Sequence, residues 1–453
     1  MEVQLPESVK TILEKFDKSG FEIYIVGGAV RDLIMGRPTN DWDFTTNATP
    51  DEILKIIPDG YYDNVFGTVG LVIPEVEHPF EITTYRTEQG YSDSRHPDKI
   101  SWGKSLEEDL SRRDFTINSL AIDKDLHVID LYNGQKDIEK KLIRAVGDPH
   151  ERFSEDALRM MRAVRIGTQL NFKIEEKTFE AIKKNAPLIN KIAKERIKDE
   201  LFKILGSENP YEGMVLLRES GLMKEILPEM EKCFGVEQKS PGRHHIYDVG
   251  THLLMSLKNC KSEDVVTRFA TMIHDIGKPQ TYRKLATGVI TFYNHEMVST
   301  RIAENIADRF RFSKKEKDKF VVLVRWHQFT VDEHQTDSAI RRILKNVGPE
   351  NMNDMLALRV GDRLGGGARE TSWRLEAFKK RLIEVQKQPF SVNDLKIDGR
   401  DVMKELDIPS GPQVGQILQK LFNEVVENKV KNEREALLKK LTAFSPKAQS
   451  SVS

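Results

Sequence analysis

Two aspartates separated by one residue, Asp41 and Asp43, are the first side chains whose spacing could support chemistry. On a strand, both would point to the same face, with Cα atoms about 6.5–7 Å apart. Carboxylates at that spacing could share two Mg²⁺ ions, one lowering the pKa of an attacking hydroxyl and the other neutralising a leaving pyrophosphate. A turn or a solvated acidic pair would look the same, so the motif needs its context.

A glycine pair lies upstream, where Gly27 and Gly28 follow the apolar run "IYIV" and precede a helical stretch. Glycines allow backbone N–H groups to approach a triphosphate at a helix N-terminus. Arg31, beside Asp32, would add a charge-assisted contact to phosphate. A simple strand-to-helix turn is the alternative interpretation. Glu81, on a later apolar strand, is the candidate third acid, although it could equally be a strand glutamate facing solvent.

The overall charge supplies no field that would attract a nucleic acid. The 453 residues contain 70 Lys and Arg against 71 Asp and Glu, a formal net charge of −1, so such a partner must be held by local patches. The 2 cysteines cannot form a disulfide framework and suggest a reducing compartment. No apolar run approaches the ~20 residues of a membrane span, and no signal peptide is evident. We therefore expect a cytoplasmic protein without a membrane partner.

The chain changes character near residue 150. Short β-branched runs alternate with helical stretches from residue 21 to about 143, and strand signals almost disappear after residue 154. The fold class expected is α+β, with a small mixed sheet and helices in a head followed by helical domains. Breaks rich in Gly and Pro give these expected domains: head 1–146, helical neck 147–238, a third helical domain 239–386 and a helical tail 387–453.

The order of strand, GG-x-x-R-D and D-W-D resembles the active-site signature of the nucleotidyltransferase superfamily that includes DNA polymerase β. Over the first 240 residues the chain is similar to the bacterial and eukaryotic type of CCA-adding tRNA nucleotidyltransferase. Four further segments carry this resemblance: "EEDLSRRDFTINSLAID" (107–123), "DLYNGQKDIEKKLIRAVGDP" (130–149), "EDALRMMRAVRI" (155–166) and "LRESGLMKEILPEM" (217–230). It implies a polymerase β-like head that adds C, C and A to the 3′ end of tRNA from CTP and ATP, with Mg²⁺ as cofactor.

The resemblance assigns triphosphate binding and ribose selection to "RRDFT", here Arg112, Arg113 and Asp114. The chemistry is reasonable, since guanidiniums can fork onto phosphate oxygens and a carboxylate can accept from a ribose hydroxyl. Without its context, the same triplet would be interpreted as a salt-bridged surface cluster.

The segment "EDALR" offers a means of choosing the base. On a helix, Asp156 and Arg159 would stand at i,i+3 beside Glu155, one offering an acceptor and the other a donor. Cytosine and adenine both present an amino donor beside a ring-nitrogen acceptor, whereas uracil and guanine present the opposite pattern. The family is described as using this pair as a protein template. Arg162 and Arg165 continue the stripe and could reach phosphate or form a solvated face.

The polar stretch 86–110 lies where the family has a flexible loop that helps the site switch from C to A. Its length favours full CCA addition over CC-only relatives. An A-adding enzyme or a poly(A) polymerase-like enzyme is the alternative, although the basic segment usual in those polymerases is replaced here by "YYDNVFGTVGLVI".

A second set of possible ligands lies beyond residue 240, in the H…HD…D order of the HD phosphohydrolase superfamily. Imidazole and carboxylate side chains suit a divalent transition metal. The resemblance implies removal of phosphate or 2′,3′-cyclic phosphate ends, with Lys278 assisting phosphate binding. A mononuclear site, a relic domain, or a chain that is mainly an HD phosphohydrolase are the alternatives. The candidate ligands are His252, His274, Asp275, Asp362 and, as in two-metal members, His295 and His327.

Basic helical segments are candidates for contact with tRNA, through phosphates and shape. They are 183–205 and 429–441, although solvated helix faces would have the same composition. The segment 408–421 could place a helix N-terminus against a phosphate or could be a simple cap. The sequence makes no prediction of oligomeric state.

Overall fold

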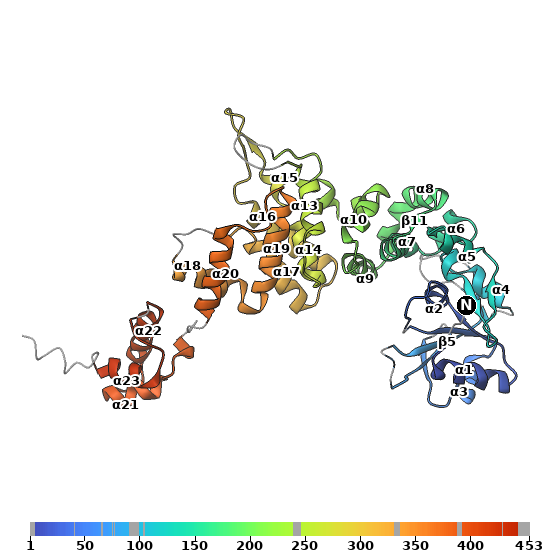
Figure 1. Cartoon of the computed structure of the whole chain (residues 1–453), viewed down its shortest axis with the longest axis horizontal. Helices are drawn as coiled ribbons and strands as arrows, with labels where there is room; N and C mark the ends of the chain where they lie inside the picture. The colour runs from blue at the N-terminus through green and yellow to red at the C-terminus, as the bar shows by residue number, and fades with distance from the viewer. Residues whose placement is uncertain are drawn as a thin grey trace, which may run out of the picture.

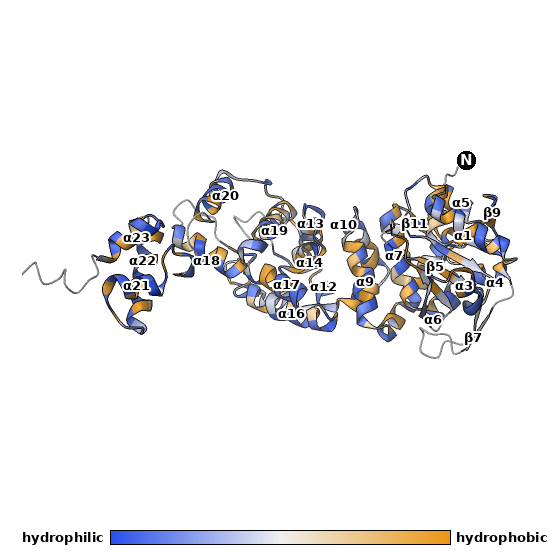
Figure 2. Cartoon of the chain, turned by 90° about the horizontal axis from the view of Figure 1, so that it is seen from below, coloured by the Kyte–Doolittle hydropathy of each residue, from blue (hydrophilic) through white to orange (hydrophobic). Residues whose placement is uncertain are grey.

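The computed structural model describes most of the chain, and its head and tail lie at opposite ends of an elongated molecule (Figure 1). Hydrophobic and hydrophilic residues share the same helices along its whole length, as amphipathic helices require (Figure 2). The described residues are 5–39, 41–64, 67–74, 76, 78–89, 99–102, 105–238, 246–329, 336–386, 392–427 and 429–442.

The head is built on one mixed sheet with the strand order β3-β4-β5-β2-β1-β8-β9. The β2–β5 pair is parallel, and the other neighbouring strands are antiparallel. The strand β2 lies inside the sheet, between β1 and β5, so its first residue is surrounded by both neighbours. The strands are β1 Ile23–Val26, β2 Asp43–Thr46, β3 Tyr61–Asn64, β4 Thr68–Leu71, β5 Phe80–Thr84, β8 Leu120–Ile122 and β9 Val128–Asp130.

The head helices bury apolar stripes against this sheet. In α1, Val9, Ile12, Leu13 and Phe16 are buried at the i, i+3, i+4, i+7 spacing of one helix face. The helix α3 lies on the same side of the sheet (Figure 1) and begins with a capping box made by Thr49 and its N3 glutamate. The head helices are α1 Glu7–Lys18, α2 Gly28–Ile34, α3 Pro50–Ile56, α4 Leu106–Ser111 and α5 Gly134–Glu139.

The segment 86–110 contains regular structure, in contrast to the predicted loop. Antiparallel strands β6 (Arg86–Gln89) and β7 (Lys99–Trp102) pair within it, and α4 follows. The strands are mostly polar and therefore lack the hydrophobic alternation from which strands are predicted. Residues 90–98 and 103–104 lie outside the described residues, so the prediction of a loop there stays a prediction.

The neck corrects one helix prediction. A single helix was expected across "EDALR", but Asp156 has extended backbone angles, φ −137° and ψ 104°, and separates two helices. Its carboxylate accepts a hydrogen bond from the N–H of Leu158 (2.9 Å), which stabilises the start of the second helix. The neck helices are α6 Pro149–Glu155, α7 Leu158–Leu170, α8 Glu176–Asn185, α9 Lys194–Leu205, α10 Pro210–Glu219, α11 Leu222–Ile226 and α12 Pro228–Glu231.

Small strand pairs lie outside the main sheet. The parallel pair β10 (Leu142–Ile143) and β11 (Lys173–Ile174) connects the end of the head to the neck, and β12 (Arg283–Lys284) pairs with β13 (Ile290–Thr291).

The central helices place two distant segments in close contact. On α19, a Cβ added at Gly361 would lie 2.7 Å from the backbone carbonyl oxygen of Ser256 on α13, so only glycine permits this approach. The approach matters because His252 lies one turn before Ser256 and Asp362 follows Gly361. The helices are α13 Val249–Lys258, α14 Val265–Ile273, α15 Lys278–Thr281, α16 His295–Arg309, α17 Lys314–Trp326, α18 Asp337–Val347, α19 Met352–Gly365 and α20 Trp373–Gln386.

The tail has a hydrophobic core of its own, drawn from residues between Leu395 and Leu441. Its helices are α21 Gly399–Leu406, α22 Pro412–Val426 and α23 Arg434–Thr442. Among the helices described, none combines the length and apolar character needed to cross a membrane.

Replacing Gly361 by alanine tests the contact between α13 and α19. We expect the added methyl group to force the helices apart and to lower the free energy of opening of α13 by about 1–3 kcal/mol, the usual cost of overpacking. Hydrogen-exchange mass spectrometry of peptides that cover α13 measures this change. Gly415→Ala on α22 is the control, because a Cβ there meets nothing within 4 Å. Unchanged exchange in Gly361→Ala would contradict the close contact.

Candidate active sites in the head and the central helices

The turn between β1 and α2 brings backbone, cation and carboxylate together. Gly27 has a φ of +75°, which glycine adopts without strain. A Cβ at this position would lie 3.2 Å from both Arg113 Nη1 and Asp43 Oδ2. The strand-to-helix turn predicted at Gly27 and Gly28 is confirmed, and it opens a backbone surface directly beside a guanidinium and an acid.

The predicted acids lie around the start of β2. Asp43 is the first residue of β2 and is the register partner of Glu81 on parallel β5. Asp41 lies two residues before β2, so the prediction that both aspartates lie on the strand is wrong for Asp41. Desolvation, together with the charges of Asp41 and Glu81 and against the opposing charge of Arg113, raises the pKa of Asp43 to about 7. A cation bound beside Asp43 would therefore favour its ionised form. Three neighbouring carboxylates suit a hard ion such as Mg²⁺.

Arg31 is held in place by two partners. It donates to both carboxylate oxygens of Asp32 (3.0 and 2.9 Å) and to Asn118 Oδ1 (2.8 Å). Asn118 in turn donates to Asp114 Oδ1 (3.1 Å). Asp32 therefore positions Arg31 here, and Asn118, which the sequence analysis missed, connects the α2 turn to the "RRDFT" segment. Asn118 lies four residues after Asp114 in the sequence, and this short spacing could have indicated a contact between the two side chains.

The two arginines of "RRDFT" share one buried acid. Asp109 accepts from Arg112 Nε (3.0 Å) and from Arg113 Nη2 (3.1 Å). Burial opposes ionisation of Asp109, but the two guanidiniums lower its pKa below the usual value. Sequence analysis missed Asp109, although it precedes the arginines by three and four residues, the spacing at which side chains meet on a helix. It binds both guanidiniums and so holds that of Arg113 beside the glycine turn.

Asp114 is an ionised acceptor. Arg162 approaches its Oδ2 with Nε at 2.8 Å and Nη2 at 2.6 Å. Burial opposes the shift, but Arg162 and Asn118 lower the pKa of Asp114 to about 2. A carboxylate in this state can accept from a ribose hydroxyl, as the resemblance implies.

The predicted base-selecting pair has protein partners in this structure. Asp156 Oδ2 lies 3.0 Å from Arg196 Nη2, and Arg159 donates to Glu155 Oε2 (2.6 Å) and to the carbonyl oxygen of Arg112 (3.1 Å). Asp156 and Arg159 do not share one continuous helix, because Asp156 lies in the break between α6 and α7. A base would have to compete for Arg159 with Glu155.

Arg165 points into the neck. Its Nε lies 2.6 Å from Glu200 Oε2 on α9, and Glu200 is buried. The sequence predicted that Arg165 would either bind phosphate or lie on a solvated face. In the structure it instead forms an ion pair that joins α7 to α9.

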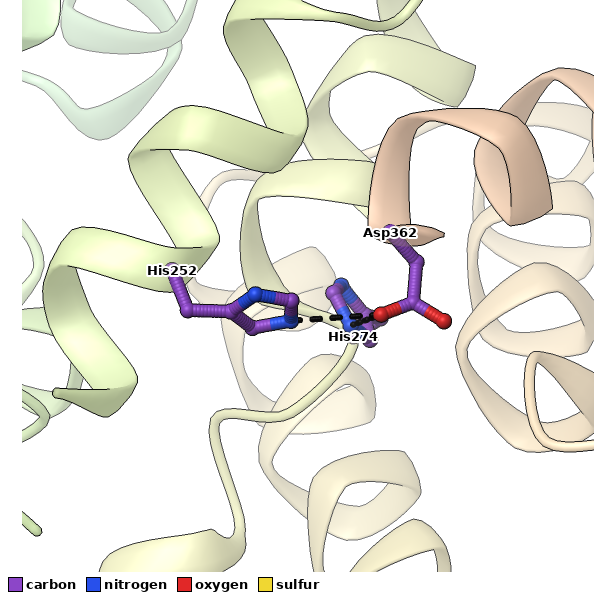
Figure 3. A group of neighbouring side chains, drawn as sticks. All are labelled: His252, His274 and Asp362. Atoms are coloured by element: carbon purple, nitrogen blue, oxygen red, sulfur yellow. Dashed lines mark ion pairs between the residues drawn. The ribbon is translucent and has the colours of Figure 1, made fainter. Parts of the chain in front are cut away.

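The second site lies where α13, α14 and α19 meet. His252 on α13 and His274, directly after α14, face the carboxylate of Asp362 on α19 (Figure 3). Asp362 Oδ1 lies 3.2 Å from His252 Nε2 and 3.5 Å from His274 Nε2. These residues are 110 positions apart in sequence, and the Gly361 contact brings them together.

Asp275 joins the remaining predicted ligands. Its Oδ1 lies 3.0 Å from His295 Nε2 and 3.3 Å from His327 Nε2, and its Oδ2 lies 3.3 Å from His274 Nε2. In each of these three histidines, Nδ1 is 2.8 Å from a backbone carbonyl oxygen. Nδ1 therefore carries the proton and turns the Nε2 lone pair toward the carboxylates.

This donor set fits divalent cations. Facing imidazole lone pairs and carboxylate oxygens repel each other unless a cation or a proton lies between them, and the cluster is largely buried. Burial opposes protonation of His274, yet Asp275 and Asp362 raise its pKa to about 10. Asp275 faces both halves of the cluster, so it could bridge two ions. The six predicted ligands thus come together in one site.

Two cations border the site. Lys278 Nζ is 2.5 Å from Asp275 Oδ2 and donates to Gln238, so Lys278 binds a candidate ligand rather than pointing freely toward solvent. Arg359, which sequence analysis missed, places Nη1 3.1 Å from Asp362 Oδ2. Both line a cavity of about 470 Å³ above the cluster. Arg359 could have been predicted from the sequence, because it stands three residues before Asp362 on the same helix.

Three family models match successive parts of the chain. The family model described as "Poly A polymerase head domain" matches residues 23–144, "Probable RNA and SrmB- binding site of polymerase A" matches 171–234, and "tRNA nucleotidyltransferase domain 2 putative" matches 295–441. A CCA-adding enzyme from Pediococcus pentosaceus is 35% identical over 95% of this chain and 96% of its own length. The chain belongs to the family of CCA-adding enzymes.

Other CCA-adding enzymes agree over the whole chain. The protein from Enterococcus faecalis is 31% identical over 94% of this chain and 93% of its own length. The crystal structure of the Bacillus stearothermophilus CCA-adding enzyme in complex with CTP matches with a TM-score of 0.70 at 26% identity, covering 99% of this chain and 100% of that one. The predicted α+β head with helical domains is therefore confirmed.

The comparisons support the head more than the second site. None of the three family matches describes an HD phosphohydrolase domain, and the third spans His295, His327 and Asp362 as part of a tRNA nucleotidyltransferase domain. The comparisons therefore do not show a hydrolytic activity, which stays a hypothesis based on the order and the geometry of the cluster residues.

Metal content tests the cluster. We expect His274→Ala to bind Mn²⁺ or Ni²⁺ at least about tenfold more weakly than the wild-type protein, because it loses a ligand at the centre of the site. Equilibrium dialysis with metal analysis measures the affinity. His150→Gln is the control, since His150 lies on α6 and contacts Asn185. Equal metal binding by wild type and His274→Ala would show that the cluster is not a metal site.

Proposed function

We propose that this protein adds C, C and A to the 3′ end of tRNA, using CTP and ATP and releasing pyrophosphate. The observation that supports this most directly is the meeting of Gly27, Arg113 and Asp43 at one point of the head. Membership of the CCA-adding family supports the choice of tRNA and of these two nucleotides.

In the proposed reaction, the triphosphate lies on the backbone after Gly27 and against the Arg113 guanidinium, which Asp109 holds in position. Asp114 accepts a hydrogen bond from the ribose. The terminal ribose oxygen of the tRNA attacks the α-phosphorus, the bond to pyrophosphate breaks, and the hydroxyl loses its proton. Asp41, Asp43 and Glu81 would hold Mg²⁺, which supplies positive charge for the attacking and leaving oxygens.

Selection of the base would use Asp156 and Arg159. For Arg159 to reach a base it must leave Glu155, so base binding exchanges one charge-assisted hydrogen bond for another. Uracil or guanine would place acceptor against acceptor and donor against donor, leaving polar groups unpaired. Arg196, the partner of Asp156, sets the position of this acceptor.

We infer a second activity at the His/Asp cluster, the hydrolysis of phosphate or 2′,3′-cyclic phosphate at RNA ends. Six ligands meet there, and Lys278 and Arg359 supply positive charge in the cavity above them. Water would attack phosphorus, the bond from phosphorus to the 3′ oxygen would break, and that oxygen would take up a proton from the water. The product therefore gains the free 3′ hydroxyl that nucleotide addition requires, and a cyclic end would keep its phosphate on the 2′ oxygen.

Two single variants separate the activities. Asp43→Asn should reduce CTP incorporation into tRNA that lacks CCA by about 100-fold or more, because the head loses its central acid, and should leave hydrolysis of a 2′,3′-cyclic phosphate unchanged. His274→Ala should do the reverse. Asp51→Asn, an exposed acid on α3, is the control for both assays. Loss of both activities in either variant would contradict two independent sites.

The template hypothesis predicts a loss of selectivity. In Arg159→Ala, the ratio of CTP to UTP incorporation should fall about tenfold or more, because a mismatched base no longer leaves the guanidinium unpaired. Incorporation of each labelled nucleotide into tRNA lacking CCA, measured separately, gives the ratio. The control is Lys177→Ala, an exposed cation of α8 that lies outside the basic segment 183–205. An equal fall in CTP and UTP incorporation would mean that Arg159 does not choose the base.

Addition of A alone is the alternative within the same class. On tRNAs that end before CCA and after CC, that enzyme would incorporate ATP into the second and CTP into neither. Poly(A) synthesis would instead extend either substrate with repeated A.

A further inference from the structure

The cavity above the His/Asp cluster continues into a second one. Gln328 and Arg359 line both cavities, and the second has a volume of about 630 Å³. Together they form a groove that begins at the candidate metal ligands and runs along the C-terminal half of α19 to the start of α20. The groove is larger than a terminal phosphate requires.

The second cavity is cationic and aromatic. Its described lining residues include Arg359, Arg363 and Arg374, and among them there is no aspartate or glutamate. Trp373 lies in the same wall and is 65% exposed as a residue. Neither catalysis in the head nor the proposed hydrolysis at the cluster uses Arg363, Arg374 or Trp373.

The arginines have a regular relation to the metal ligands. Arg359 and Arg363 stand at i,i+4 on α19 and are therefore on one helix face, about 6 Å apart along the axis. Asp362 lies between them, and Arg359 Nη1 contacts it at 3.1 Å. Arg359 also lies over the buried ring of Phe329, 5.7 Å from its centroid, which limits its movement. The spacing suits successive phosphates of one strand.

We propose that this groove binds the single-stranded end of an RNA. The terminal phosphate lies at the His/Asp cluster, the preceding phosphates lie against Arg359, Arg363 and Arg374, and a base stacks on Trp373. Single-stranded RNA is bound by a cationic groove with aromatic platforms, and both features are present here. An acidic peptide would use the cations but not the aromatic ring. The proposal rests on the hydrolytic activity inferred above. It adds that the nucleotides preceding the reactive end are also bound, so the preferred substrate is an oligonucleotide rather than a mononucleotide.

Kinetics on two substrates of different length test the proposal. One is the mononucleotide 2′,3′-cyclic AMP, and the other is a trinucleotide with the same cyclic end. We expect kcat/KM to be about tenfold or more higher for the trinucleotide, mainly through a lower KM. Equal kcat/KM values for the two substrates would overturn the proposal that the groove binds RNA.

Variants of the groove should remove that advantage. We expect Trp373→Ala and Arg363→Ala each to lower the ratio of the two kcat/KM values about fivefold or more, and Trp373→Phe to retain it, because a phenyl ring still stacks. Arg342→Ala, an exposed arginine of α18 outside both cavities, is the matched control and should leave the ratio unchanged. An unchanged ratio in Trp373→Ala would overturn the assignment.

Binding separates failure of the groove from failure of the hydrolytic function. If neither substrate is hydrolysed, the activity proposed for the cluster is wrong, but a fluorescent trinucleotide with a 3′-phosphate still reports on the groove. Its anisotropy should show affinity at least about fivefold lower for Trp373→Ala than for wild type and for Trp373→Phe. Equal affinities of the three proteins would overturn the proposal that the groove binds RNA, whether or not the cluster hydrolyses phosphate.

Discussion

The head depends on one electrostatic constraint, the burial of acidic charge at the start of β2. Asp43 pairs in register with Glu81, and desolvation together with its acidic neighbours raises its pKa to about 7. Ionised carboxylates in such a place need positive charge. The surrounding structure supplies Arg113, held by Asp109, at the edge of the glycine turn. The site is therefore arranged for cations and phosphates before either binds.

The central helices also bury acidic charge, but mainly histidines rather than arginines surround it. Asp275 and Asp362 are surrounded by histidines, and backbone carbonyls fix the orientation of three of these rings. Close approach at Gly361 assembles the cluster from helices that are far apart in sequence. Since the head would need a free 3′ hydroxyl, hydrolysis at the cluster would prepare the substrate that the head extends.

The turn at Gly27 was predictable from the sequence, because it depends on local backbone. The six residues of the cluster were predicted from their order along the chain, although packing of distant helices brings them together, and their role as metal ligands stays a prediction. Asp156 was placed wrongly on a helix, since its side-chain bond to Leu158 ends one helix and begins another. The partner of Arg165 and the Trp373 groove were not predictable, because Glu200 and the meeting of α19 with α20 depend on tertiary packing.

The most direct measurement is the sequence of the 3′ ends that the purified protein makes on tRNA lacking CCA, with all four nucleoside triphosphates present. The triphosphate site proposed in the head and the base-selecting pair proposed in the neck predict products that end in CCA with no further extension. Products that end in a single A, in repeated A or in mixtures of all four nucleotides would contradict it.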